Sequence, residues 1–298
     1  MAQGILNLIK PYGATSFSLV AAVKRLTGIK HTGHAGTLDP LATGVLPVCL
    51  GQGTRIVEFL MDATKLYRAE IELGMATDTY DAAGRILYRG NPDGIGKEQM
   101  EIVLSSFRGT IQQVPPMYSA LKHHGKPLYV LARSGISIAR ESRQVQILRL
   151  ELLDYTAPVL TIEIECSKGT YIRSLAYDLG EQLGCGAYLK NLMRLRCGPF
   201  DIKEAVSLPE LEEAVCCGYW ERYLYPLDAV LLHLNAAVVG DETGEDIKNG
   251  RPLALKGNPA LSPPESYCRA YATSGSFLGV LRYDASTGVW QPHKVFCR

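Results

Sequence analysis

Residues 33–48 of the chain read GHAGTLDPLATGVLPV, and their one acidic residue is Asp39. Asp39 is also the first carboxylate of the whole chain, although four lysine or arginine residues and two histidines precede it. The glycines around it allow tight turns and the close approach of a ligand, because glycine has no Cβ. Pro40 stiffens the backbone directly after the carboxylate. Taken alone, such an aspartate more often binds its own backbone in an Asx-turn or a helix cap. A catalytic role for Asp39 therefore needs support from other segments of the sequence.

The composition is that of a globular protein. The chain has 298 residues, of which 47% are hydrophobic and 20% are charged. This length predicts one large domain with a small one appended. No apolar run is long enough to cross a bilayer, and Lys10 follows the apolar residues 5–9 too soon for a signal peptide. We therefore expect a cytoplasmic protein that does not associate with membranes.

Metal ligands are sparse in the sequence. The eight cysteines are scattered through apolar segments and form no C-x-x-C pair, which argues against zinc and against a disulfide framework. His31 and His34 are three residues apart, but Asp39 is the one further ligand type nearby. No metal site is expected.

Basic residues are unevenly distributed, although the formal net charge is only +1. Residues 108–149 contain seven lysine or arginine residues and one acid, and residues 187–203 contain four, among them Arg194, and one acid. The acids gather at 204–221. Such segregation predicts a positive surface for a polyanion whose phosphates must be neutralised. A solvated basic face without a partner is the alternative.

Periodic patterns predict an α+β chain. Strands are expected at 5–9, 45–50 and 65–74 and as a hairpin of 145–155 and 159–166, and helices at 16–25, 97–107 and 169–184. The segment 112–143 is long, basic and aromatic, which is typical of a functional loop. A boundary at 226–234 divides a large domain, residues 1–230, from a small β-rich domain, residues 231–298.

Four side chains could carry chemistry together. Besides Asp39 they are Arg173, a permanent cation able to grip a carboxylate with two prongs, Tyr67, whose ring could stack on a base, and His34, a planar ring that could fill a base's place in a stack. Each has a simpler interpretation: a surface salt bridge for Arg173, a core position for Tyr67 and a loop hydrogen bond for His34.

Five motifs that occur in a particular order favour the functional interpretation of these residues over the simpler one. Residues 33–47 resemble the catalytic motif of the bacterial tRNA pseudouridine-55 synthases. Their companions also resemble motifs of that family: KPYGATS at 10–16, Tyr67 with LGMATDTYD at 73–81, PPMYSALK at 115–122 and GTYIRSL at 169–175. Five motifs in the same order over residues 4–200 make chance agreement implausible.

The resemblance implies a pseudouridine-synthase fold, with a mixed, mainly antiparallel central sheet flanked by helices and loops, that isomerises a uridine in the T loop of tRNA without cofactor or metal. Asp39 would be the catalytic aspartate and Arg173 its partner. Tyr67 would stack on the target base and His34 would take the place of the flipped nucleotide. The residues expected to line the pocket or grip the RNA are Tyr171, Leu192, Lys10, Lys122, Lys126, Arg133 and Arg194. The partner is the T arm of tRNA, no protein partner is obligatory, and a monomer is expected.

The physics of the reaction agrees with this assignment, because a buried uridine must leave its stack and needs an aromatic platform, a group to fill the gap and a basic groove. One departure is Met193, where relatives commonly carry a second arginine. The last sixty-odd residues resemble the small RNA-binding domain called PUA only loosely. Two alternatives are a guide-RNA-dependent synthase of the same superfamily, against which the long basic loop argues, and an RNA-folding chaperone.

Overall fold

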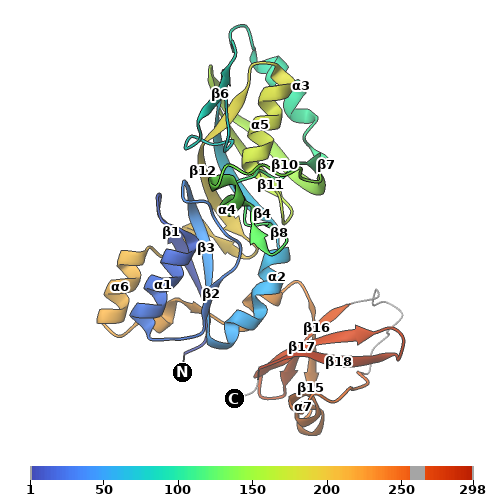
Figure 1. Cartoon of the computed structure of the whole chain (residues 1–298). Coiled ribbons are helices and arrows are strands. Elements are labelled where there is room, and N and C mark those ends of the chain that lie inside the picture. The colour runs from blue at the N-terminus through green and yellow to red at the C-terminus, as the bar shows by residue number, and fades with distance from the viewer. Residues whose placement is uncertain (1, 256–265, 297–298) are drawn as a thin grey trace.

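The computed structural model describes residues 2–255 and 266–296, and its main feature is one ten-stranded sheet (Figure 1). The strand order is β14-β1-β3-β12-β4-β11-β10-β7, with β2 added beside β3 and β13 beside β12. The bounds are β1 Gly4–Lys10, β2 Thr32–His34, β3 Ala42–Leu50, β4 Lys65–Leu73, β7 Gly109–Gln113, β10 Arg143–Thr156, β11 Val159–Cys166, β12 Ala187–Cys197, β13 Phe200–Asp201 and β14 Leu224–Tyr225. Neighbouring strands are antiparallel except β12 and β3, which are parallel. The predicted mixed, mainly antiparallel sheet is confirmed.

The helices lie along different parts of the chain, and the last of them packs on the C-terminal strands rather than on the large sheet (Figure 1). They are α1 Ser16–Thr27, α2 Val57–Asp62, α3 Lys97–Ser105, α4 Leu128–Arg133, α5 Ile172–Leu183, α6 Leu208–Cys216 and α7 Asp241–Lys248. Short 3-10 turns lie at Gly51–Ile56, Ile202–Glu204, Trp220–Tyr223 and Leu227–Leu231. No helix among the described residues is long and apolar enough to cross a membrane.

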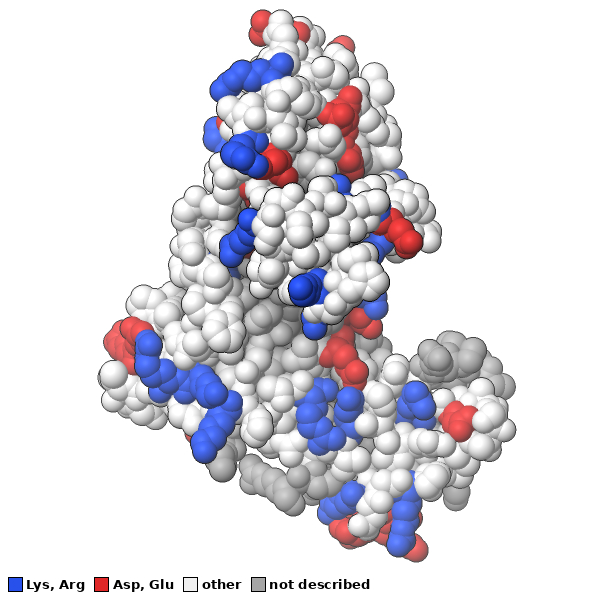
Figure 2. All heavy atoms as spheres, in the orientation of Figure 1, with Lys and Arg blue, Asp and Glu red and all other residues white. Residues whose placement is uncertain are grey.

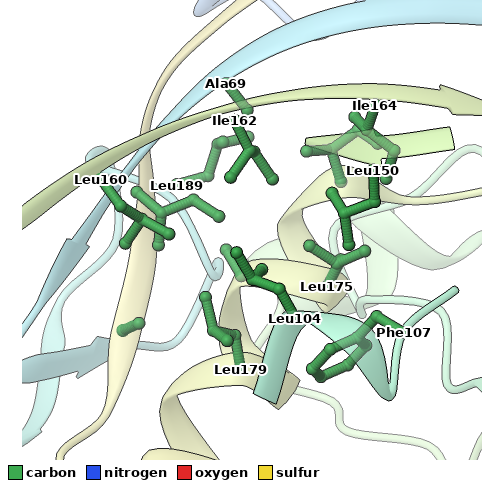
Figure 3. Packing of buried hydrophobic residues seen from close by; sticks show 14 of the residues in the cluster. Ala69, Leu104, Phe107, Leu150, Leu160, Ile162, Ile164, Leu175, Leu179 and Leu189 are labelled. Carbon is green, nitrogen blue, oxygen red and sulfur yellow. The ribbon is translucent and has the colours of Figure 1, made fainter. Parts of the chain in front are cut away.

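The core beneath α5 shows why the predicted patterns fold as they do. Leu175 and Leu179 of α5 pack with Leu104 of α3 against β-strand side chains such as Ile162 and Leu150 (Figure 3). Ala69, Ile71 and Leu73 are buried on the apolar face of β4, as its alternation predicts. This packing fixes the start of α5 against the middle of the sheet.

α1 begins where the sequence predicts it and ends at Thr27, two residues beyond the predicted end. Thr15 and Ser18 form a reciprocal capping box at its N-terminus, and Gly28 ends it with φ of 70°, a conformation that favours glycine. Its buried residues, Leu19, Val20 and Val23 among them, pack on β1 and β3 side chains.

A β-rich unit follows the large sheet. It contains β15 Asn235–Val239, β16 Tyr267–Ala272, β17 Phe277–Asp284 and β18 Val289–Val295, in sequential order in one sheet. Residues 256–265 and 297–298 of the predicted small domain lie outside the described residues. Glu58 of α2 pairs with His293 and Lys294 of β18, each at 3.1 Å, and the ring of Phe59 meets that of Tyr267 edge to face. The unit therefore packs against α2.

Two local predictions need correction. The segment 187–203 was expected to be a basic surface, yet most of it forms β12, a central strand of the sheet. Lys190 pairs with Glu72 of β4 at 2.8 Å and Arg196 with Glu165 of β11 at 2.7 Å, so carboxylates of other strands in the sheet neutralise these cations. Four small strands were also not predicted, and they form two separate pairs: β5 Met75–Thr77 with β6 Ile86–Arg89, and β8 Lys122–His123 with β9 Lys126–Pro127.

Candidate functional site

Asp39 lies in the loop between β2 and β3, and the N-terminal motif holds that loop. The Oγ of Ser16 accepts a hydrogen bond from Leu38 N at 2.9 Å and lies 3.1 Å from Leu38 O, to which it donates. Pro40 O accepts hydrogen bonds from Gly13 N at 2.8 Å and from Lys10 Nζ at 3.3 Å. The residues on both sides of Asp39 are therefore tied to the chain between β1 and α1.

Arg173, at the start of α5, meets Asp39. Its Nε lies 2.9 Å from Asp39 Oδ2, and its side chain is 4% exposed. This contact is an ion pair. Nη1 donates to Thr79 O at 3.3 Å and Nη2 to Tyr118 O at 2.9 Å. The predicted two-pronged contact with Asp39 is therefore not formed. The two other guanidinium nitrogens instead donate to the backbone of two other loops.

Asp81 is a second carboxylate of the site that the sequence did not single out. Its Oδ2 lies 3.8 Å from Arg173 Nη1, and its Oδ1 accepts hydrogen bonds from Thr79 Oγ1 at 2.6 Å and Ala83 N at 3.0 Å. The preceding Tyr80 has φ of 65°, unusual outside glycine, and its ring stacks on Tyr177 at 4.1 Å. Asp81 is the last residue of the motif at 73–81. Its burial beside Arg173 is what distinguishes it from an ordinary turn aspartate, and the sequence does not show that burial.

A pocket opens between these carboxylates. Asp39, Asp81, Arg173 and Leu192 line it together with Leu41, Ala42, Leu189, Lys190 and Asn191, and it holds about 230 Å³ of empty space including its mouth. The pocket is lined by both charged and apolar side chains. Three predicted site residues thus meet at one opening.

Burial raises the pKa of Asp39 above its ordinary value, and the charge of Arg173 is the largest effect in the opposite direction. The charge of Asp81 adds to the rise. The Asp39 side chain keeps 40% of its surface exposed, so its desolvation comes from the protein that surrounds it rather than from complete enclosure. Arg173 therefore favours the ionised form of Asp39 against the effect of burial.

Tyr67 and Tyr171 were also expected at the site, but neither lines the pocket. Tyr67 lies opposite Arg194 in the pairing of β4 with β12, and its ring packs, with Leu192, against the buried clusters on both sides. Burial raises its pKa to about 12, although Arg194 opposes the shift. Gln113 holds the backbone of Tyr171 at both ends, accepting from Tyr171 N at 2.8 Å and donating to Tyr171 O at 2.9 Å.

His34 is the last residue of β2, and its Nδ1 is buried without a hydrogen-bond partner among the described residues. Burial lowers the pKa of His34, and the nearby charge of Arg194 lowers it further. A neutral ring with an unused polar atom is suited to a ligand contact.

Lys10 and Arg194 do not lie on an RNA-contacting surface, contrary to expectation. Lys10 is 0% exposed, and its Nζ donates to the carbonyls of Pro11, Ala14 and Pro40. Arg194 is 1% exposed, and it donates from Nε to Val45 O at 2.6 Å and from Nη2 to Gly36 O at 3.1 Å. A buried cation needs such acceptors, and here they belong to the Asp39 loop and its neighbours. Both side chains therefore hold the Asp39 loop in place through its backbone carbonyls.

Lys122, Lys126 and Arg133 lie apart from the pocket, on β8, β9 and α4. All three are exposed, and none forms an ion pair with another residue that the structure describes. Tyr118 O, near the start of this segment, accepts from Arg173, so the segment is joined to the pocket at its base.

Comparison with known sequences identifies relatives along most of the chain. Residues 24–172 match the TruB family pseudouridylate synthase N-terminal domain, and residues 173–239 match the tRNA pseudouridylate synthase B C-terminal domain. A tRNA pseudouridine synthase B of Dehalococcoides mccartyi (strain ATCC BAA-2100) is 46% identical over 99% of this chain and 97% of its own length. The enzyme of that name from Geobacillus thermodenitrificans is 42% identical, over 99% of both chains.

Solved structures share the fold. A crystal structure of a Cbf5-Nop10-Gar1 complex contains a chain that is 26% identical, covers 94% of this chain and 78% of its own length, and superposes with a TM-score of 0.75. A chain of an archaeal box H/ACA complex, 24% identical, has the same TM-score over 99% of this chain and 86% of its own.

Proposed function

The chain belongs to the TruB family of pseudouridylate synthases and is a tRNA pseudouridine synthase, and on this basis we propose that it isomerises uridine 55 in the T loop of tRNA. The reaction breaks the C–N bond between base and sugar and rejoins the same base through a carbon. Because it exchanges no atoms or electrons with a second reactant, we propose that it needs no cofactor and no metal.

The observation that carries this proposal is the ion pair of Asp39 and Arg173 in a pocket that both residues line. An ionised carboxylate can serve as nucleophile or base, and an arginine that is 4% exposed keeps it ionised against desolvation. We assign the catalytic role to Asp39 and the role of its charge partner to Arg173.

A uridine in a folded loop must leave its stack to reach Asp39. We propose that Tyr67 stacks on the flipped base, with Tyr171 and Leu192 beside it, and that His34 fills the vacated place. The unused Nδ1 of His34 supports this role because a nucleotide neighbour would satisfy it.

The test uses purified protein and an unmodified tRNA transcript, with no other component. We expect pseudouridine at position 55 and at no other uridine, because we propose a monomer without an obligatory protein or guide RNA. Modification only after addition of a second RNA or protein would instead favour the guide-dependent alternative.

Binding of tRNA is expected to weaken steeply with salt. We propose that the exposed Lys122, Lys126 and Arg133 contact phosphates, since each released counterion contributes to the slope of log K against log salt. Replacing all three with alanine should reduce that slope by about two to three units, roughly one per lost contact. The matched control is Arg85→Ala, an exposed cation already paired with Asp78. A triple variant with the parent's slope would remove this segment from the interface.

Two variants of Tyr67 distinguish the contribution of its ring from that of its hydroxyl. Tyr67→Phe should keep tRNA affinity, whereas Tyr67→Leu should lose roughly 1 to 3 kcal/mol of base stacking. Affinity and single-turnover rate are measured for both, with thermal unfolding as a control because Tyr67 also packs against the buried clusters. If both variants bind and turn over like the parent, Tyr67 is a core residue and not the platform.

We propose that the C-terminal β-rich unit, residues 231–298, is a PUA-like RNA-binding domain appended to a catalytic domain of residues 1–230, and that the enzyme acts in the cytoplasm. A tRNA-folding role would use the same gripping surface, since the cations of 112–143 lie apart from Asp39. Such a role predicts that an Asp39→Asn protein still accelerates the folding of a misfolded tRNA transcript.

A further inference from the structure

Two aromatic rings stand in solvent beside the Asp39 loop. Phe17 is 78% exposed and Tyr12 is 66% exposed, which makes them the most exposed aromatic side chains among the described residues. A single exposed apolar residue is ordinary. Two large exposed rings close together are less so, because a ligand that buried either ring completely would gain roughly 1.5–3 kcal/mol of binding free energy.

Both rings have a rigid support. Tyr12 precedes Gly13, whose N–H donates to Pro40 O at 2.8 Å. Phe17 follows Ser16, whose hydroxyl donates a hydrogen bond to Leu38 O and accepts one from Leu38 N. The rings are thus carried by the two turns that hold either side of Asp39, and a nucleotide beside the target uridine would come within their reach.

The exposed side of α1 continues from Phe17 to Lys24 and Arg25, since residues seven and eight positions apart lie on one side of a helix. Lys30 follows in the next turn of chain. Figure 2 shows a run of blue atoms at the lower left, where Figure 1 places the C-terminal end of α1. None of these three cations forms an ion pair within the described part of the chain, and residues 2–38 contain no aspartate or glutamate.

We propose that the α1 face, defined as Tyr12, Phe17, Lys24, Arg25 and Lys30, is a second RNA-binding surface continuous with the catalytic pocket. Tyr12 and Phe17 stack on unpaired bases next to the target nucleotide, and the three cations neutralise phosphates of the same strand. This inference rests on the proposed function, because it assumes that the RNA at Asp39 extends over α1.

RNA fits this surface better than an apolar protein partner does. A partner that covered the rings would also desolvate neighbouring cations that have no carboxylate of their own, which is unfavourable. An RNA strand offers base faces and phosphates together at short spacing. The rings require unpaired bases, because a duplex hides the faces of its bases.

The test compares three proteins with the parent on an unmodified tRNA transcript. They are a ring variant, Tyr12→Ala with Phe17→Ser, a charge variant in which Lys24, Arg25 and Lys30 become alanine, and a control, Ile102→Ser, which changes a residue of α3 that is 71% exposed. The dissociation constant is measured over a salt series, and the melting temperature is measured for each protein.

The ring variant should bind at least about five-fold more weakly with an unchanged salt slope, because stacking is not a counterion effect. The charge variant should lose about two to three units of slope, and the control should match the parent. Neither variant should change the melting temperature by much, since the altered side chains are exposed. The ring effect should vanish when a fully paired RNA duplex replaces tRNA.

Parent-like binding by both variants, or an equal loss by the ring variant on paired duplex, would overturn the α1 face as a stacking surface. A parent protein that forms no pseudouridine in tRNA would instead refute the proposed function. The parent's own activity therefore distinguishes the two failures.

Discussion

Replacing Asp39 with asparagine is expected to abolish pseudouridine formation, with a rate loss of at least about 10³-fold. Asparagine has nearly the same shape but cannot be ionised, so it can act neither as nucleophile nor as base. Affinity for tRNA should stay within a few-fold of the parent, because the exposed cations that we assign to phosphates lie elsewhere. Single-turnover formation of pseudouridine and equilibrium binding measure the two effects separately.

Asp62→Asn is the matched control for this change. Asp62 is also a carboxylate with a cationic partner, Lys168, but its side chain is 64% exposed and it does not line the pocket. We expect parent-like rates from it. Substantial turnover by Asp39→Asn would refute the assignment of the catalytic aspartate.

The second large effect is expected from Arg173. Arg173→Lys keeps a positive charge but offers one point of contact in place of a planar group that reaches Asp39 and the carbonyls of Thr79 and Tyr118. The rate should therefore fall while binding is largely retained. Arg173→Ala should lose more, because it leaves Asp39 and Asp81 without the cation between them.

The pH dependence of the Arg173 variants gives a readout that a folding defect would not imitate. Burial already raises the pKa of Asp39, and Arg173 opposes that rise. Since the reaction needs the ionised carboxylate, the rate falls as the pH drops through this pKa. Loss of Arg173 raises the pKa further, so the acidic limb of the pH–rate profile should move to higher pH.

Arg68→Lys controls for the loss of a guanidinium, because Arg68 forms an ion pair with Glu163 at 3.2 Å and does not line the pocket. Its acidic limb should not move. If single-turnover rates and the limb of both Arg173 variants coincide with those of the parent, Arg173 is not the charge partner of Asp39.

The elements that sequence reasoning found have regular patterns of their own. β4 alternates apolar and polar residues, and α1 has a cap, an apolar stripe and a terminal glycine. β12 was missed because its lysine, asparagine and arginine residues interrupt the apolar pattern, and two register shifts break its alternation. A central strand can carry such residues when other strands of the sheet supply their partners, as β4 does with Glu72 and β11 with Glu165.

The sequence by itself determined the family, through five ordered motifs, and it singled out Asp39 and Arg173. Only the tertiary structure decided how these residues are held. The sequence alone predicts RNA contacts for Arg194 and Lys10, because it does not show whether a cation is buried. Arg194 is satisfied by the carbonyls of Val45 and Gly36, which are 149 and 158 residues away along the chain. Partners at such separations exist only once the strands are assembled, so local sequence patterns cannot reveal which cations face RNA and which support the catalytic loop.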